Sequence, residues 1–219
     1  MKIVPSLLAE NFDDFLVRLK QAESFADYVQ IDIMDGMFVE TKSFSAEKLN
    51  TLRTSLSFEV HLMAKDPLVL AKSIMHPGLK MVIFHYESDG DHRDLIKTIR
   101  GRGLRVGMAI KPETRTGEFT DIAVNVDTLL FLTVDPGCYG SPFKPEVLEK
   151  VAKARQLFSS KTIAVDGGVS LDNLKLFFEI GVNYVCVGSR IFLHGNPDEN
   201  YKLFTGKVQE LERAREYGS

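Results

Sequence analysis

Short apolar segments with the character of β-strands alternate with helical segments along the whole of this 219-residue chain. Strands are expected at 2–8, 28–34, 58–62, 81–84, 104–110, 128–134, 162–165 and 184–187. Helices are expected at 11–25, 46–56, 91–101, 145–158, 170–180 and 197–217, and others are expected to begin at 66 and 112. Strands that alternate with helices form parallel sheets, because each helix returns the chain to the same end of the sheet.

About eight strand–helix units in a chain of this length fit a closed barrel better than an open sheet. We therefore predict an α/β fold, a single (β/α)8 TIM barrel that forms one domain over residues 1–219. The alternative is a doubly wound open sheet. That fold usually has a glycine-rich turn after its first strand, and residues 7–10 (LLAE) contain no glycine.

Composition narrows the class of protein and its partners. The formal net charge of −3 argues against nucleic acid and against an anionic membrane. No apolar run approaches the ~18 residues of a membrane span. The two cysteines, Cys138 and Cys186, have neither metal-site spacing nor the pattern of a disulfide framework. These features predict a soluble, cytoplasmic protein.

The strand predicted at 28–34 carries an aspartate in an unusual position. Its residues alternate, so Gln30, Asp32 and Met34 share one face of the strand and β-branched residues occupy the other. A buried carboxylate is costly unless it has a partner, and α/β folds keep their chemistry at the C-terminal ends of strands. The alternative interpretation of Asp32 is a hydrogen-bonded structural aspartate.

Other strands of the predicted barrel bring polar residues to the same mouth. Ser6 ends the first strand, His61 and Met63 lie on the third, and Asp166 ends the seventh. Alone, His61 is more typical of a core histidine, and the methionines are more typical of core filler. Two aspartates and a histidine together form an inward cluster that a purely structural core would avoid.

Glycines in two consecutive loops predict a phosphate site. Gly167 and Gly168 follow the seventh strand, and Gly188 and Ser189 follow the eighth. Backbone N–H groups after these two strands form the standard phosphate site of a TIM barrel. The alternative is a pair of ordinary tight turns.

A phosphate site beside opposed carboxylates predicts a small phosphorylated sugar as substrate. Two aspartates on either side of a carbon next to a carbonyl can epimerise that carbon through an enediolate. A divalent metal held by Asp32, His61 and Asp166 would stabilise the enediolate oxygens.

Six segments of the chain resemble the ribulose-phosphate 3-epimerase family. They are 5–8 (PSLL), 31–39 (IDIMDGMFV), 60–63 (VHLM), 133–137 (TVDPG), 165–169 (VDGGV) and 187–189 (VGS). The resemblance implies a metal-dependent isomerase of the pentose phosphate pathway, one that interconverts D-ribulose 5-phosphate and D-xylulose 5-phosphate, and a homo-oligomer. It implies that a divalent metal is the cofactor, either zinc or one of manganese, iron and cobalt. Asp32 and Asp166 would be the acid–base pair and, with His61, the metal ligands.

The resemblance also assigns the residues that contact substrate. Those assigned are Ser6, Met34, His61, Met63, Gly137, Cys138, Tyr139, Gly140, Gly167, Gly168, Gly188 and Ser189. The chain departs from the family at Gln30, where the family has a fourth metal ligand, a histidine, and at Tyr139, where it has a glycine. A neutral amide oxygen is a poor ligand for zinc, so Gln30 predicts weakened or absent metal binding. Arg190, where a small residue is usual, has no assigned role.

Three alternatives to this function remain open from the sequence. One is an epimerase of a ketohexose 6-phosphate such as allulose 6-phosphate, and another is an impaired member that only binds a sugar phosphate. The third is a decarboxylase or aldolase of the orotidine-phosphate type. That type has an Asp-x-Lys-x-x-Asp motif on its third strand, whereas residues 59–64 read EVHLMA. His76, His85, His92 and His194 receive no role, although His85 ends a strand.

Overall fold

The computed structural model describes residues 1–137 and 139–217. Eight parallel strands pair in sequence order and close into a barrel, because β8 also pairs with β1. The strands are β1 (Lys2–Leu7), β2 (Tyr28–Met34), β3 (Ser57–Met63), β4 (Leu79–His85), β5 (Arg105–Ile110), β6 (Thr128–Leu132), β7 (Thr162–Asp166) and β8 (Tyr184–Val187). This topology confirms the predicted TIM barrel.

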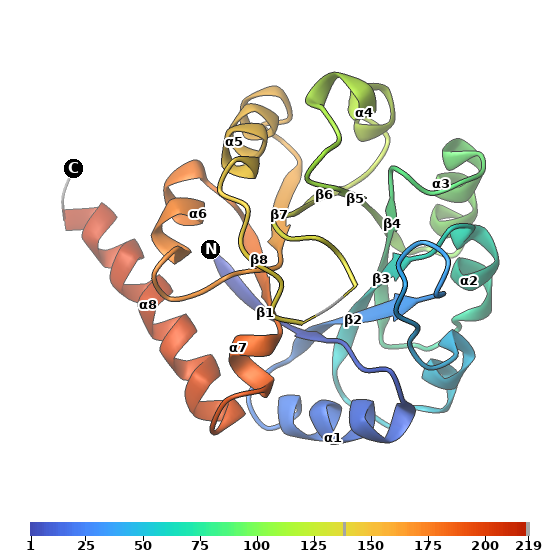
Figure 1. Cartoon of the computed structure of the whole chain (residues 1–219), viewed down its shortest axis with the longest axis horizontal. Helices are drawn as coiled ribbons and strands as arrows, with labels where there is room; N and C mark the ends of the chain where they lie inside the picture. Colours follow the sequence, from blue (N-terminus) through green and yellow to red (C-terminus); the bar gives the residue numbers. More distant parts are fainter. Residues whose placement is uncertain (138, 218–219) are drawn as a thin grey trace.

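Helices surround the barrel and cover its outer face (Figure 1). They are α1 (Phe12–Ala22), α2 (Pro67–Ser73), α3 (His92–Arg100), α4 (Thr116–Ala123), α5 (Val147–Leu157), α6 (Leu174–Ile180), α7 (Ser189–Phe192), α8 (Pro197–Tyr217) and the 3₁₀ helix η1 (Ala46–Thr51). The side chains of Asn11, Asp66 and Asp91 accept hydrogen bonds from backbone N–H groups and cap α1, α2 and α3. Within the described residues, no helix combines the length and apolar character needed to cross a membrane.

Several helix and strand boundaries differ from those expected. The helix expected at 46–56 is the short η1, because Ser45 provides no side-chain cap and the Leu52 N–H bonds to Leu49, three residues back. The strand expected at 128–134 ends at Leu132, and the helices expected from 112 and 170 begin at Thr116 and Leu174. The single turn α7 was not expected.

Alternation along the strands separates the interior of the barrel from its outer layer. Val29, Ile31 and Ile33 point outward and join the large core beneath the helices. The smaller core inside the barrel contains Val4, Met81, Ile83, Ala109, Leu130, Leu132, Ala164, Tyr184 and Cys186. Gln30 and Asp32 are buried on the opposite face of β2 from the three outward residues, as the alternation predicts.

A buried carboxylate lies near the N-terminal end of the barrel, away from the predicted mouth. Glu59 of β3 is 1% exposed and accepts hydrogen bonds from the hydroxyl groups of Tyr28 and Tyr184. Burial raises the pKa of Glu59 from its ordinary value of 4.5 to about 7, although both tyrosines and the charge of Arg105 oppose the rise. The ionised form of Glu59 is therefore unfavourable in the folded protein.

This raised pKa predicts how stability depends on pH. Glu59 ionises at a lower pH in the unfolded chain than in the folded protein. The contribution of Glu59 to stability is therefore fully present below pH 4.5 and is lost as the pH rises to about 7. Relative to wild type, Glu59→Gln should gain about 3 kcal/mol in unfolding free energy between pH 4.5 and pH 8. Urea unfolding at both pH values measures the difference. The exposed Glu149→Gln is the control and should show no such gain.

Candidate active site

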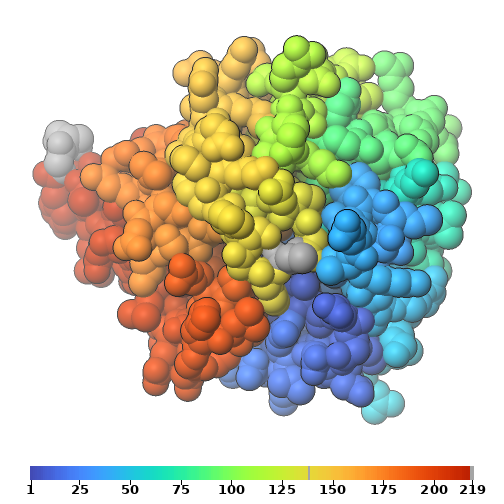
Figure 2. Space-filling model, in the orientation of Figure 1, coloured from blue at the N-terminus to red at the C-terminus, as the bar shows by residue number. Residues whose placement is uncertain are grey.

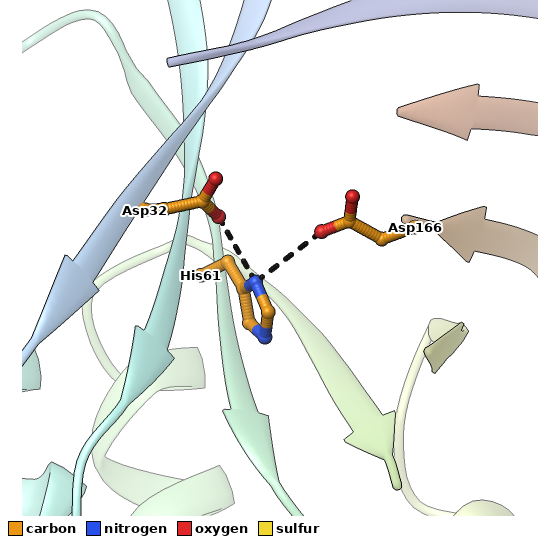
Figure 3. Close-up of side chains that lie close together, drawn as sticks. All are labelled: Asp32, His61 and Asp166. Atoms are coloured by element: carbon orange, nitrogen blue, oxygen red, sulfur yellow. Dashed lines mark hydrogen bonds and ion pairs between the residues drawn. The ribbon is translucent and has the colours of Figure 1, made fainter. Parts of the chain in front are cut away.

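Three side chains from separate strands converge at the C-terminal end of the barrel. The His61 Nδ1 atom lies 3.0 Å from Asp32 Oδ1 and 3.6 Å from Asp166 Oδ2. Asp32 and His61 are direct neighbours in the pairing of β2 with β3. Asp166 reaches them from β7, and both carboxylates face the same ring nitrogen (Figure 3). The structure thus brings together the three residues that the sequence placed at the mouth.

The charges of this cluster are strongly coupled. Burial raises the pKa of Asp32, the hydrogen bond with His61 opposes the rise, and the negative charge of Asp166 adds to it. Burial alone would lower the pKa of His61, but the adjacent carboxylates of Asp166 and Asp32 raise it to about 9. The Ser6 hydroxyl donates to Asp32 Oδ2 at 2.6 Å. Without a metal, a protonated His61 therefore balances part of the buried negative charge.

Gln30 joins the two carboxylates. Its Nε2 atom donates to Asp32 Oδ1 at 2.9 Å and to Asp166 Oδ2 at 2.7 Å. The Cys186 thiol donates to Gln30 Oε1 at 3.1 Å, which fixes the amide with its NH2 group toward the aspartates. Gln30 thus presents two hydrogen-bond donors to the site, and its oxygen points elsewhere.

The donor set of the cluster fits a divalent cation. One ligand atom each from Asp32, His61 and Asp166 lies within 4.8 Å of the others. Two carboxylate oxygens and one imidazole nitrogen suit several transition metals. In the orientation set by Cys186, the amide NH2 group of Gln30 has no lone pair to offer to a metal. Among the described residues, the cluster provides three candidate ligand atoms, and this amide stands where the resemblance implies a histidine.

Three of the predicted substrate contacts, Ser6, Met34 and Met63, do not share one environment. Met63 and Ser6 line the cavity beside the cluster. Met34 is 2% exposed, and the Thr41 hydroxyl lies 3.2 Å from its sulfur atom. The same hydroxyl donates to the Gly137 carbonyl oxygen at 2.5 Å, which ties the loop after β2 to the loop after β6.

The two glycine loops after β7 and β8 also line this cavity. Gly167 and Gly168 have positive φ angles of 96° and 63°. A Cβ atom at Gly167 would lie 2.3 Å from Val134, so the close approach of this loop requires glycine. The predicted residues Gly140, Gly188 and Ser189 line the cavity as well, whereas Cys138 lies outside the described residues. Arg190 is exposed.

Tyr139 fills the side of the cavity next to these loops. A Cβ atom at Gly188 would lie 2.3 Å from the ring carbon Cε1 of Tyr139. The Tyr139 hydroxyl donates to the Ser6 carbonyl oxygen at 2.8 Å and accepts from the Leu8 N–H at 2.9 Å. The remaining cavity measures about 60 Å³. In Figure 2 the segment after β6, in yellow, covers the centre of this face.

A second histidine, to which the sequence assigned no role, contacts the cluster. His85, the last residue of β4, lies with its Nε2 atom 2.9 Å from His61 Nε2, and its Nδ1 atom lies 3.1 Å from Glu87 Oε2. Burial lowers the pKa of His85 to about 4. The only signal in the sequence was the position of His85 at a strand end.

A family model and several known proteins match most of this chain. A family model described as the ribulose-phosphate 3 epimerase family matches residues 2–192. The chain is 34% identical to a ribulose-phosphate 3-epimerase of Treponema pallidum, over 87% of this chain and 90% of the relative. It is 33% identical to the ribulose-phosphate 3-epimerase, cytoplasmic isoform, of Oryza sativa subsp. japonica, over 90% of each chain. For the Schizosaccharomyces pombe protein of the same name, identity is 29% over 98% of this chain and 96% of the relative.

Solved structures with low identity share the fold. The chain superposes on KGPDC from Streptococcus mutans in complex with D-R5P with a TM-score of 0.73 and 15% identity, over 95% and 97% of the two chains. For orotidine 5'-phosphate decarboxylase from Pyrococcus horikoshii OT3, the TM-score is 0.66 with 14% identity, over 94% and 99%.

The orientation of Gln30 predicts the effect of restoring an imidazole. Gln30→His should increase zinc affinity at least about 10-fold, because it adds a fourth ligand to Asp32, His61 and Asp166. Isothermal titration calorimetry with zinc on metal-free protein measures the change. Gln30→Met is the matched control, since it keeps the length of the side chain and adds no imidazole. Equal zinc affinity in Gln30→His and wild type would contradict the prediction.

Proposed function

The chain belongs to the ribulose-phosphate 3-epimerase family, and we propose that it interconverts D-ribulose 5-phosphate and D-xylulose 5-phosphate. It is an isomerase that acts on carbohydrates. The observation that carries the proposal is the pair of carboxylates, Asp32 and Asp166, which face one site and both contact His61 Nδ1 and Gln30 Nε2. This arrangement supplies two proton-transfer groups to a single substrate carbon.

The reaction needs one of these groups ionised and the other protonated. The hydrogen on C3 of the substrate is acidic because C2 is a carbonyl carbon. One carboxylate removes this proton, the electron pair moves toward the carbonyl oxygen, and an enediolate forms. The other carboxyl group returns a proton to the opposite face of C3. The pKa of Asp32, raised by burial, favours a proton on that group at the stage when it must donate.

Negative charge on the enediolate oxygens requires compensation. A divalent ion held by Asp32, His61 and Asp166 would supply it as a Lewis acid. With two carboxylates, one imidazole and no fourth protein ligand, the site suits manganese, iron or cobalt at least as well as zinc. The Gln30 amide keeps the two carboxylates fixed relative to each other through its two N–H bonds.

The phosphate end of the substrate would lie against the loops after β7 and β8. Backbone N–H groups at Gly167, Gly168, Gly188 and Ser189 support this assignment, because these loops form the phosphate site in many TIM barrels. The Tyr139 ring lies against Gly188 in this space, so we expect a bound phosphate to displace it. Oligomerisation and a cytoplasmic location stay predictions.

The alternatives have less support. The named relatives are ribulose-phosphate 3-epimerases, so an allulose 6-phosphate epimerase is not favoured. The orotidine type shares the fold, but the position of its central lysine on β3 carries His61. Turnover of ribulose 5-phosphate, with and without EDTA, tests the proposal against an impaired member of the family.

Single substitutions of the aspartates separate the two proton transfers. Asp32→Asn and Asp166→Asn should each reduce epimerisation at least about 100-fold, the lower range for loss of a general acid or base. In D2O each variant should still exchange the C3 hydrogen of one epimer, because the remaining carboxylate can still act on its own face. NMR of ribulose 5-phosphate and xylulose 5-phosphate measures both rates. Exchange of the same epimer by both variants would contradict the two-base mechanism.

Removing the Tyr139 ring should ease substrate binding. Displacement of the ring breaks two hydrogen bonds, each worth about 1 kcal/mol, so Tyr139→Gly should lower the KM for ribulose 5-phosphate up to about 30-fold. Tyr139→Phe is the matched variant, because it keeps the ring and loses both hydrogen bonds. Its KM should fall by a similar factor. A higher KM in Tyr139→Gly would show instead that the ring contributes to binding.

A further inference from the structure

We propose that Glu87 and His85 are positioning residues that set the direction of the hydrogen bond to His61, so that His61 keeps its Nε2 hydrogen and a bound metal would meet the Nδ1 lone pair on the side of Asp32 and Asp166. The proposal rests on the proposed function, since it concerns the same metal site. It adds two residues from β4 and the loop after it, neither of which touches the substrate carbon.

The contacts form one continuous chain. His61 Nε2 lies 2.9 Å from His85 Nε2, and His85 Nδ1 lies 3.1 Å from Glu87 Oε2. Glu87 is fixed at its other oxygen, which accepts from the Lys111 N–H at 2.9 Å and from the Thr114 hydroxyl. Both histidine rings are buried, with exposed fractions of 1% or less. Solvent therefore does not replace the contact between the two rings.

The donors and acceptors leave one consistent direction. An ionised carboxylate only accepts, so Glu87 requires a hydrogen on His85 Nδ1. A neutral His85 then has a lone pair on Nε2 and must accept from His61, whose hydrogen lies on Nε2. Nδ1 is the remaining atom of His61, and it faces both aspartates. In the reverse direction His85 would carry both hydrogens, and the hydrogen of His61 would lie on Nδ1, where it blocks a metal.

Packing holds the His85 ring in place. Its centre lies 4.5 Å from the centre of the Phe38 ring, and the Lys111 ammonium lies 3.9 Å from the centre of that same Phe38 ring. These contacts support the position of the His85 ring between His61 and Glu87. Metal-binding histidines usually donate their second N–H to a carboxylate or carbonyl. Here His85 transmits the effect of the Glu87 carboxylate across one further ring.

The direct test is the tautomer of His85. Long-range 15N–1H correlation spectra of protein labelled with 15N-histidine report which ring nitrogen carries hydrogen, and single substitutions assign the five histidines. In zinc-loaded wild type, His85 should carry hydrogen on Nδ1 alone. A hydrogen on His85 Nε2 in this form would overturn the proposal. This measurement needs no turnover, so its result is independent of whether the protein epimerises ribulose 5-phosphate.

Variants of Glu87 and His85 test whether Glu87 acts on His61 through His85. Glu87→Gln offers a donor as well as an acceptor, so His85 Nε2–H should appear and the zinc dissociation constant should rise about 10–100-fold. Glu113→Gln is the control, because this exposed glutamate lies outside the chain of contacts and its loss removes the same charge. His85→Gln keeps an acceptor oxygen for His61 and should retain more zinc affinity than His85→Leu. Unchanged tautomer and zinc affinity in Glu87→Gln, or equal loss in both His85 variants, would contradict the proposal.

Discussion

The interaction on which the site depends is the contact of two buried carboxylates with one imidazole. Asp32 and Asp166 repel each other, and burial increases the cost of their charges. His61 lies between them, and Ser6 and Gln30 donate further hydrogen bonds. The barrel can hold this cluster because β2 and β3 place Asp32 and His61 side by side, and the closed sheet brings Asp166 of β7 to the same site. The fold thereby keeps two acidic groups facing one site.

Gln30 changes how this cluster is held together. An imidazole at this position would bind a metal, whereas the amide binds both carboxylates directly, and Cys186 determines which end of the amide faces them. A bound metal would then have one ligand fewer, but the aspartates keep a common partner without it. The geometry of the two carboxylates therefore depends less on metal occupancy than it would in a site with four metal ligands.

Much of the architecture follows from sequence periodicity. The alternation in β2 predicted that Asp32 points inward, and the positions of His61 and Asp166 at strand ends predicted the cluster. Glu87 and His85 were not predicted, because the contact of His85 with His61 joins two strands and both contacts of the His85 ring depend on its orientation, which periodicity does not encode. The orientation of Gln30 depends on Cys186, which is 156 residues away in the sequence. The predicted length of the helix that begins at Ala46 was wrong, because capping, rather than apolar spacing, determines where η1 ends.

The placement of Glu59 on the same strand face as His61 has a consequence for folding. Parallel strands can slip by two residues and still keep their apolar faces buried. In β3 such a slip toward the mouth would move Glu59 to the level of His61, where it would meet Asp32 and Asp166. Three buried acidic groups with no intervening cation would repel strongly. The acidic centre therefore disfavours this shifted alignment of β3.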